Sequence, residues 1–446
     1  MKQYDAIFIG SGHAAWHGAT ILKQAGKSVL IIEKDLEGGT CTNYGCDAKI
    51  LLDGPFEVLH KSNRYQGIGK EGDFTINWPQ LMAYKDAVTN PFPQFLNGMF
   101  QRLVFDFIKG HSQLTGEHTV LVNGEEIYGE NIIIGIGARE ARLNIPGQEF
   151  LKDSRDFLSL HALPDRFVMI GAGIISLEFA SMMALLGKEV HIIEFTSQAL
   201  AAYHQDYVAT VVADLEKQGV QFHFNQAVAS VEEVAKGYLV KTQNGLALEV
   251  DYVLDATGRV ANVENIGLKS LGIEASARGI KVDDHLRTKY PHIYVSGDVI
   301  DKTVPKLTPT AIFESKYIAG QILGNQEAIS YPAIPNLVFT LPRIGQVGVT
   351  VKEAKANENL QIIPYKYGQA SLFETKNEKD AEITFILDEN KHLVGAELIS
   401  DDAEAILNMM TLIINQKITG QDLGNMIFAF PGVTHAIISQ LGAVMR

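Results

Sequence analysis

Residues 4–15 read YDAIFIGSGHAA. An apolar run typical of a buried parallel strand leads into Gly10 and Gly12, and Ala15 takes the third small-residue position before an expected helix. The next apolar stretch, SVLIIE, ends in the acidic Glu33. This order predicts a βαβ unit that binds a dinucleotide. The glycines let the backbone approach a pyrophosphate, the helix N-terminus binds it, and the carboxylate takes a ribose hydroxyl.

The same arrangement occurs again in RFVMIGAGIISLEFA, residues 166–180. Here Gly171, Gly173 and Ser176 hold the three small-residue positions, and the following strand EVHIIE ends in Glu194. One such motif is common without any nucleotide, whereas two in one chain predict two dinucleotides, such as FAD and a nicotinamide. Because Glu194 stands where a 2′-phosphate would need an arginine, NAD(H) is favoured over NADP(H).

The rest of the chain indicates how these units are arranged. Three more strand-like runs end in small residues, and Asp298 follows the last of them, where it could hydrogen-bond a polar chain. From about residue 331 the pattern changes to short strands and one helix, which suggests a separate α+β domain. The predicted fold class is α/β, with two Rossmann-like domains, one inserted in the other, and a C-terminal α+β domain. We expect these at 1–146 with 260–325, at 147–259, and at 326–446.

Composition excludes several classes of function. Of the 446 residues, 46% are hydrophobic and 20% charged, and the formal net charge is −14. An acidic protein offers no basic surface for phosphate contacts, so we expect neither a nucleic-acid nor an anionic-membrane partner. No apolar run approaches the ~20 residues of a membrane span. Two cysteines are too few for a secreted disulfide scaffold, so we expect a cytoplasmic protein.

The two cysteines, Cys41 and Cys46, lie in the stretch GGTCTNYGCDAKI, residues 38–50. They could form a structural staple, half of a metal site, or a redox pair. A zinc site needs about four ligands, and no other His or Cys has suitable spacing, so no metal site is predicted. A staple would close a very small loop and add little stability. A thiol near the N-terminus of the helix expected at AKILL is favoured as the reactive thiolate, which favours the redox pair.

Together these motifs resemble the pyridine nucleotide–disulfide oxidoreductases of the glutathione reductase and dihydrolipoamide dehydrogenase type, over the whole chain. GGTCTNYGC is similar to the active-site disulfide motif of that family, GSGHAA to its FAD site and GAGIISLE to its NAD site. DATGRVAN and YVSGD are similar to its linker and second FAD motif, and LTPTA to the segment beside the flavin ring. Within the family, EFTSQAL is most similar to dihydrolipoamide dehydrogenases.

The resemblance implies roles for individual residues. Cys41 would be the interchange thiol that attacks substrate, Cys46 the thiol facing the flavin, and Lys49 and Glu178 an ion pair beside flavin N5. If solvated, the last two would be ordinary helix residues. The implied cofactor contacts are Gly10, Gly12, Ala15, Glu33, Gly39, Thr40, Gly258, Gly297, Asp298 and Ala311 for FAD, and Gly171, Gly173 and Glu194 for NAD(H).

One departure from the family lies near the C-terminus, in IFAFPGVTHAI. The family has a His-x-His-Pro segment followed by a glutamate, and this His–Glu dyad of the partner subunit shuttles protons for the interchange thiol. Pro431 sets the register, so Phe430 stands at the catalytic histidine position, Phe428 at the other histidine, and His435 at the glutamate. A phenyl ring carries no proton, and general acid–base help is typically worth ~10²–10⁴-fold.

The same Phe-then-His arrangement is found in 2-ketopropyl-coenzyme M oxidoreductase/carboxylase, a member of this family that must keep protons from an enolate. Three hypotheses therefore stand. The first is an NADH- and FAD-dependent reductase of a small disulfide or thioether, the second a carboxylase-like enzyme that cleaves C–S bonds with proton exclusion, and the third a redox-sensing or electron-transfer flavoprotein. The resemblance also implies a homodimer whose active site is completed by the partner's C-terminal domain.

Overall fold

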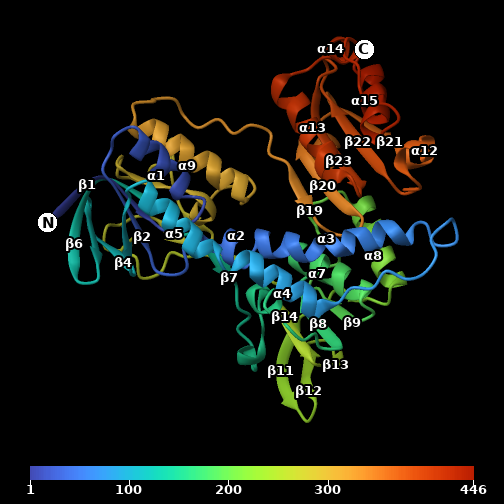
Figure 1. Cartoon of the computed structure of the whole chain (residues 1–446), viewed down its shortest axis with the longest axis horizontal. Helices are drawn as coiled ribbons and strands as arrows, with labels where there is room; N and C mark the ends of the chain where they lie inside the picture. The colour runs from blue at the N-terminus through green and yellow to red at the C-terminus, as the bar shows by residue number, and fades with distance from the viewer.

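The computed structural model describes residues 1–446, which form two Rossmann-like units and a C-terminal domain (Figure 1). No helix combines the length and the apolar composition needed to cross a membrane.

The first unit is a seven-stranded sheet with the order β3-β2-β1-β6-β5-β4, and β18 pairs with β6. Strands β1, β2, β3, β6 and β18 run parallel, which places their carboxyl ends at one edge. All five residues of β2 are buried because both faces of a parallel sheet are covered. The strands span Lys2–Ile9 (β1), Val29–Glu33 (β2), Asp106–Lys109 (β3), Ser112–Gly116 (β4), Thr119–Val122 (β5), Glu125–Ile134 (β6) and Ile293–Val295 (β18).

Because β18 returns to pair with β6 of the first sheet, the chain between β6 and β18 contains an inserted unit, as predicted. Its four-stranded parallel sheet has the order β10-β9-β8-β14, beside an antiparallel sheet of β11, β12 and β13. These strands span Arg166–Ile170 (β8), Glu189–Ile193 (β9), Gln221–His223 (β10), Val228–Val234 (β11), Gly237–Thr242 (β12), Ala247–Val250 (β13) and Tyr252–Asp255 (β14). A two-stranded sheet of β7 (Ala138–Glu140) and β15 (Arg259–Ala261) connects the two units.

Helices cover these sheets and carry the predicted site. Helix α1 packs against α9 in the first unit, and α3 packs against α4 and against α7 of the inserted unit. Almost all of α7 is buried, since it lies between the inserted sheet and α3 and α8. The helices span Trp16–Gln24 (α1), Gly39–Tyr44 (α2), Cys46–Asn63 (α3), Trp78–Thr89 (α4), Phe92–Arg102 (α5), Ile174–Leu185 (α7), Gln205–Lys217 (α8) and Thr308–Ile322 (α9).

The C-terminal domain is the predicted α+β unit. Its antiparallel sheet has the order β19-β20-β23-β22-β21, and α13 packs on β20 and β23. The strands span Asn336–Val338 (β19), Arg343–Gly348 (β20), Gln361–Tyr365 (β21), Glu382–Leu387 (β22) and Leu393–Ser400 (β23), and the helices Val351–Ala354 (α10), Tyr367–Ala370 (α11), Leu372–Thr375 (α12), Ala403–Gln416 (α13), Gly420–Gly424 (α14) and Val433–Val444 (α15). The remaining short elements are α6 (Ser154–Phe157), β16 (Ala275–Ser276), β17 (Gly279–Ile280) and the 3-10 turns Gln148–Phe150 and Gly297–Val299.

A buried ion-pair cluster connects the C-terminal domain to α3. Arg343 of β20 donates to Asp53 and to Glu57 of α3, each at 2.8 Å. The Arg343 side chain is only 5% exposed, so each charge depends on its partners for the solvation that it has lost. This cluster holds the C-terminal domain against the helix that begins at Cys46.

Candidate active site

A cavity of about 840 Å³ opens at the carboxyl ends of the first parallel sheet, which is where nucleotides bind in open α/β sheets. Its lining includes eight of the predicted site residues: Gly10, Gly12, Glu33, Gly39, Thr40, Cys41, Asp298 and Ala311. The sheet therefore brings together residues from segments that are far apart in the sequence.

Close backbone contacts at the cavity explain two of its glycines. Gly10 has φ +104°, and a Cβ there would lie 2.5 Å from the Gly135 carbonyl oxygen. Gly39 has φ +72°, and its Cβ would lie 2.9 Å from Gly12 Cα. Side chains are excluded at both positions, so the backbone itself borders the cavity. This suits a cofactor whose pyrophosphate must approach main-chain N–H groups.

Three predicted FAD contacts do not line the cavity. Ala15 is completely buried, and its methyl group would contact a Cβ at Gly135 at 3.4 Å, so it serves helix–sheet packing. Gly297 is also buried, and its N–H donates to Glu314 at 2.7 Å. Gly258 precedes β15, where Arg259 rather than the glycine borders the cavity. Ala15 and Gly297 therefore support the cavity from its buried side.

The two acidic strand ends make equivalent contacts. Glu33 Oε2 accepts the N–H and the hydroxyl of Ser11, each at 2.8 Å, and Ser11 lies between the first two glycines of its motif. Glu194 Oε2 accepts the N–H of Ala172 at 2.7 Å, at the matching place between Gly171 and Gly173. A carboxylate oxygen has more than one lone pair, so each acid can still accept a ribose hydroxyl. The sequence repeat is thus also a repeat in three dimensions.

The thiols lie on two consecutive helices. Cys41 is in α2, a helix of six residues that was not predicted, and Cys46 is the first residue of α3, directly after Gly45. A hydrogen bond from the Cys41 thiol lowers the pKa of Cys46 to about 6, and Thr308 and Lys49 act in the same direction. The same bond, together with burial, raises the pKa of Cys41 well above its usual range. The reduced pair therefore holds one thiolate, on Cys46, and one proton, on Cys41.

Thr308 is a site residue that sequence reasoning missed. Its Oγ1 lies 3.6 Å from Cys46 Sγ, and it is the first residue of α9. It belongs to the quoted segment LTPTA, in which only Ala311 was singled out. No sequence pattern predicts that this hydroxyl contacts a thiol, so only the tertiary structure identifies it.

Lys49 and Glu178 pair as the family resemblance implied. Lys49 Nζ lies 3.1 Å from each Glu178 carboxylate oxygen, and the Glu178 side chain is 5% exposed. The N–H of Phe339 also donates to Glu178 at 2.9 Å, and Lys49 Nζ lies 3.7 Å from the centre of the Phe339 ring. Burial raises the pKa of Glu178, and the Lys49 charge offsets part of this effect. The two residues are thus not solvated helix residues, and the pair lies one helical turn from Cys46.

Four arginines on the cavity wall were also missed: Arg139, Arg142, Arg155 and Arg259. Arg142 donates to Asp153 at 2.7 Å, and Arg259 donates to Glu140 at 2.8 Å. Arg139 and Arg259 lie in segments that predict strands and a linker, whereas Arg142 and Arg155 lie in no recognisable motif. Each of the four guanidinium groups pairs with a carboxylate on the same wall, so the arginines add hydrogen-bond donors to the cavity rather than net positive charge.

Phe430 and His435 lie in the C-terminal domain, where α15 packs against α12 and α14. Figure 1 shows α15, the helix that contains His435, on the side of that domain away from α2, the helix that contains Cys41. Phe430 is 66% exposed, and its ring meets the His435 ring edge to face with centroids 5.1 Å apart. His435 Nδ1 lies 3.6 Å from Glu374 Oε1.

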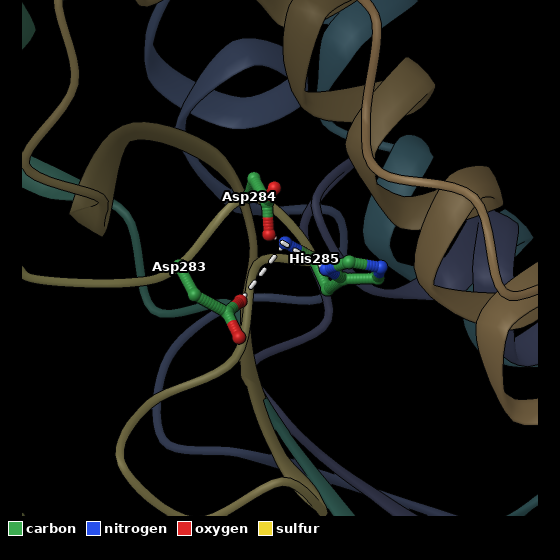
Figure 2. A group of neighbouring side chains, drawn as sticks. All are labelled: Asp283, Asp284 and His285. Carbon is green, nitrogen blue, oxygen red and sulfur yellow. Dashed lines mark hydrogen bonds and ion pairs between the residues drawn. The ribbon is translucent and has the colours of Figure 1, made fainter.

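A cluster of potential metal ligands lies outside the cavity, at Asp283, Asp284 and His285 (Figure 2). Asp283 accepts the backbone N–H of His285 at 2.9 Å and that of Arg287 at 2.8 Å. His285 Nδ1 lies 2.7 Å from Asp284, and Nε2 lies 3.1 Å from the Gln326 carbonyl oxygen. These contacts hold a turn, and exposed acidic groups are common without an ion, so we assign no metal here.

A thiol pair beside a dinucleotide-sized cavity, next to a second nucleotide-binding unit, defines an oxidoreductase that acts on sulfur groups. The chain belongs to the pyridine nucleotide-disulphide oxidoreductase family: residues 4–315 match that family, and residues 334–440 match its dimerisation domain. The predicted resemblance is confirmed, and the cofactors of this family are FAD and NAD(H).

Individual relatives cover nearly the whole chain. The chain is 31% identical to a dihydrolipoyl dehydrogenase of Chlamydia trachomatis, over 96% of this chain and 94% of that protein. It is 28% identical to a dihydrolipoyl dehydrogenase of Bacillus subtilis, over 98% and 99% respectively. Among solved structures, the HOCl-induced flavoprotein disulfide reductase RclA from Escherichia coli matches with a TM-score of 0.88 and 25% identity, over 99% of this chain and 100% of that one.

Proposed function

We propose that the protein is an NADH-dependent FAD enzyme that reduces a small disulfide or activated thioether through Cys41 and Cys46. The observation that carries the proposal is the thiol pair itself: Cys41 lines the cavity, and Cys46 begins the next helix directly after Gly45. When bound, FAD supplies two-electron exchange between the nicotinamide and the thiol pair. Cys41 then attacks the sulfur of the substrate, and Cys46 resolves the mixed disulfide.

The residues around the cavity suit this use. Gly10, Gly12 and Gly39 would present backbone to the pyrophosphate, while Glu33 and Asp298 would hold hydroxyl groups of the bound chain. The Lys49–Glu178 pair lies one turn from Cys46 and would provide a fixed charge pair at the redox centre.

The nicotinamide and the assembly belong to the same proposal. Glu194 supports NADH over NADPH, because a 2′-phosphate beside it would face a carboxylate. The match to the dimerisation domain supports a homodimer, and the position of α15 supports an active site that the partner's C-terminal domain completes. The domains of the chain span 1–146 with 260–325, 147–259, and 326–446. The low number of cysteines supports a cytoplasmic location.

A second candidate is reductive C–S cleavage with proton exclusion, favoured by the exposed Phe430 ring at the histidine position of the family. The two functions are separated by anaerobic NADH oxidation with a panel of small disulfides, comparing the native protein with Phe430→His. Rapid native turnover that the added histidine does not improve supports the reductase. Slow native turnover that the histidine raises supports C–S chemistry. Flavin reduction with no turnover of any substrate supports a redox sensor or an electron carrier.

A further inference from the structure

Glu314 is a completely buried carboxylate of α9. Its two oxygens have separate partners. Lys302 Nζ and the Tyr331 hydroxyl both donate to Oε1, the hydroxyl at 2.7 Å, whereas the N–H of Gly297 donates to Oε2 at 2.7 Å. A buried carboxylate is costly unless it is paired and hydrogen-bonded, and here both conditions are met. Because Lys302 and Tyr331 hold one oxygen, the other is fixed toward a backbone N–H.

The N–H of Gly297 is the second one beyond the end of β18. The preceding N–H, of Ser296, still donates to the carbonyl oxygen of Ile134 at 3.0 Å, and the chain then turns away from the sheet. Gly297 has φ +81°, and a Cβ there would lie 2.7 Å from the Cβ of Ala14, so the turn packs closely against the segment that precedes α1. A buried backbone donor needs a partner, and Glu314 supplies it.

This turn positions Asp298, which follows Gly297 and lines the large cavity. On the other side of the turn, Lys306 Nζ donates to the carbonyl oxygen of Asp298 at 2.9 Å. The backbone is therefore held at both ends, by Glu314 at Gly297 and by Lys306 at Asp298. Both contacts are made with backbone groups, so neither occupies the carboxylate that would accept hydroxyl groups of the bound chain.

Tyr331 belongs to the linker that connects α9 with β19 of the C-terminal domain (Figure 1). Most residues of this linker, 323–335, are exposed, whereas Tyr331 is partly buried. Besides its hydrogen bond to Glu314, its ring packs on Phe313 with centroids 5.8 Å apart. The linker is thus fastened to the same carboxylate that holds the turn at Gly297.

We propose that Glu314 is a positioning residue of the flavin site, and that Tyr331 orients it from the linker. Glu314 fixes the turn at Gly297, so that the Asp298 carboxylate meets the polar chain of FAD at a fixed place. The inference rests on the role of Asp298 in the proposed function. It gives the linker an effect on the cofactor, because a change at Tyr331 reaches Asp298 through one carboxylate. The alternative is that the buried Lys302–Glu314 pair only stabilises the fold.

The rate of FAD release from the holoenzyme provides the test. It is followed by the rise of flavin fluorescence after dilution, in the absence of nicotinamide and disulfide. Tyr331→Phe removes one donor to Glu314 without changing any charge, and we expect it to accelerate FAD release roughly threefold. Glu314→Gln keeps the shape of the side chain but loses its charge and one acceptor oxygen, and it should accelerate release about tenfold.

A double-mutant cycle with Asp298→Ala separates positioning from general stabilisation. Asp298→Ala alone should release FAD about tenfold faster than the native protein. If Tyr331 and Glu314 act through Asp298, Tyr331→Phe should change the rate less than ~1.5-fold once residue 298 is alanine. A contribution to fold stability alone would give the same threefold acceleration in both backgrounds, and that result would overturn the inference. An Asp298→Ala variant that releases FAD at the native rate would overturn it as well.

Tyr317→Phe is the matched control. The Tyr317 hydroxyl also fastens α9 to the linker, by donating to the carbonyl oxygen of Glu327 at 2.7 Å, but it does not contact Glu314. Its loss should leave FAD release at the native rate. Equal acceleration in Tyr317→Phe and Tyr331→Phe, or none in Tyr331→Phe, would refute the role of Glu314. FAD release needs no substrate, so a native protein that holds FAD but reduces no disulfide would reject only the proposed disulfide reduction.

Discussion

Replacement of Thr308 by valine should raise the pKa of Cys46. The Thr308 hydroxyl lies 3.6 Å from Cys46 Sγ and lowers the pKa of that thiol, which is about 6. Valine has nearly the same shape as threonine but has no hydroxyl group to donate a hydrogen bond. A long hydrogen bond to a thiolate is worth about 1.5 kcal/mol, the low end for a charged acceptor. At 1.36 kcal/mol per pKa unit, this corresponds to a rise of roughly one unit.

The assay is the pH dependence of thiolate absorbance and of alkylation rate in the reduced protein. The midpoint of both curves should rise by roughly one pH unit, so the thiolate fraction at neutral pH should fall. Thr310→Val is the control, since Thr310 lies in the same helical turn and its hydroxyl has no hydrogen-bond partner. An unchanged titration curve in Thr308→Val, or an equal shift in both variants, would show that the hydroxyl does not hold the thiolate.

Three further predictions concern the cofactor, the domain interface and the order of electron transfer. Glu194→Arg should shift the ratio of kcat/KM for NADH over NADPH by about 10²-fold toward NADPH, roughly 2.7 kcal/mol, as measured by steady-state kinetics with each nucleotide. Arg343→Met should lower the free energy of unfolding by about 3–5 kcal/mol, because Asp53 and Glu57 lose their partner. A decrease of less than about 1 kcal/mol in a denaturant titration, which is the contribution of one weak surface pair, would contradict this prediction. Cys41→Ser should abolish disulfide reduction and preserve flavin reduction by NADH, and stopped-flow loss of both would reverse the proposed electron order.

Local sequence patterns were sufficient to predict most of the fold. The strands β1 and β2, their Gly-rich turn and the acid that follows are consecutive in sequence, so periodicity and turn chemistry suffice to predict them. The repeat at Gly171 follows the same rules, and the change of pattern after residue 331 marks the C-terminal domain. The short helix α2 escaped prediction because six residues with two thiols between glycines show no helical period.

The site depended on packing between segments that are distant in the chain. The sequence by itself determined the two dinucleotide motifs, the cysteine pair and the phenylalanine that precedes Pro431. Only the tertiary structure decided that Thr308 contacts Cys46, that Ala15 packs behind the cavity, and that Glu374 faces His435. Short-range patterns follow from the geometry of one strand or helix. Contacts such as these depend instead on how separate units pack against one another. The residues involved have no regular spacing along the chain from which the contact could be predicted.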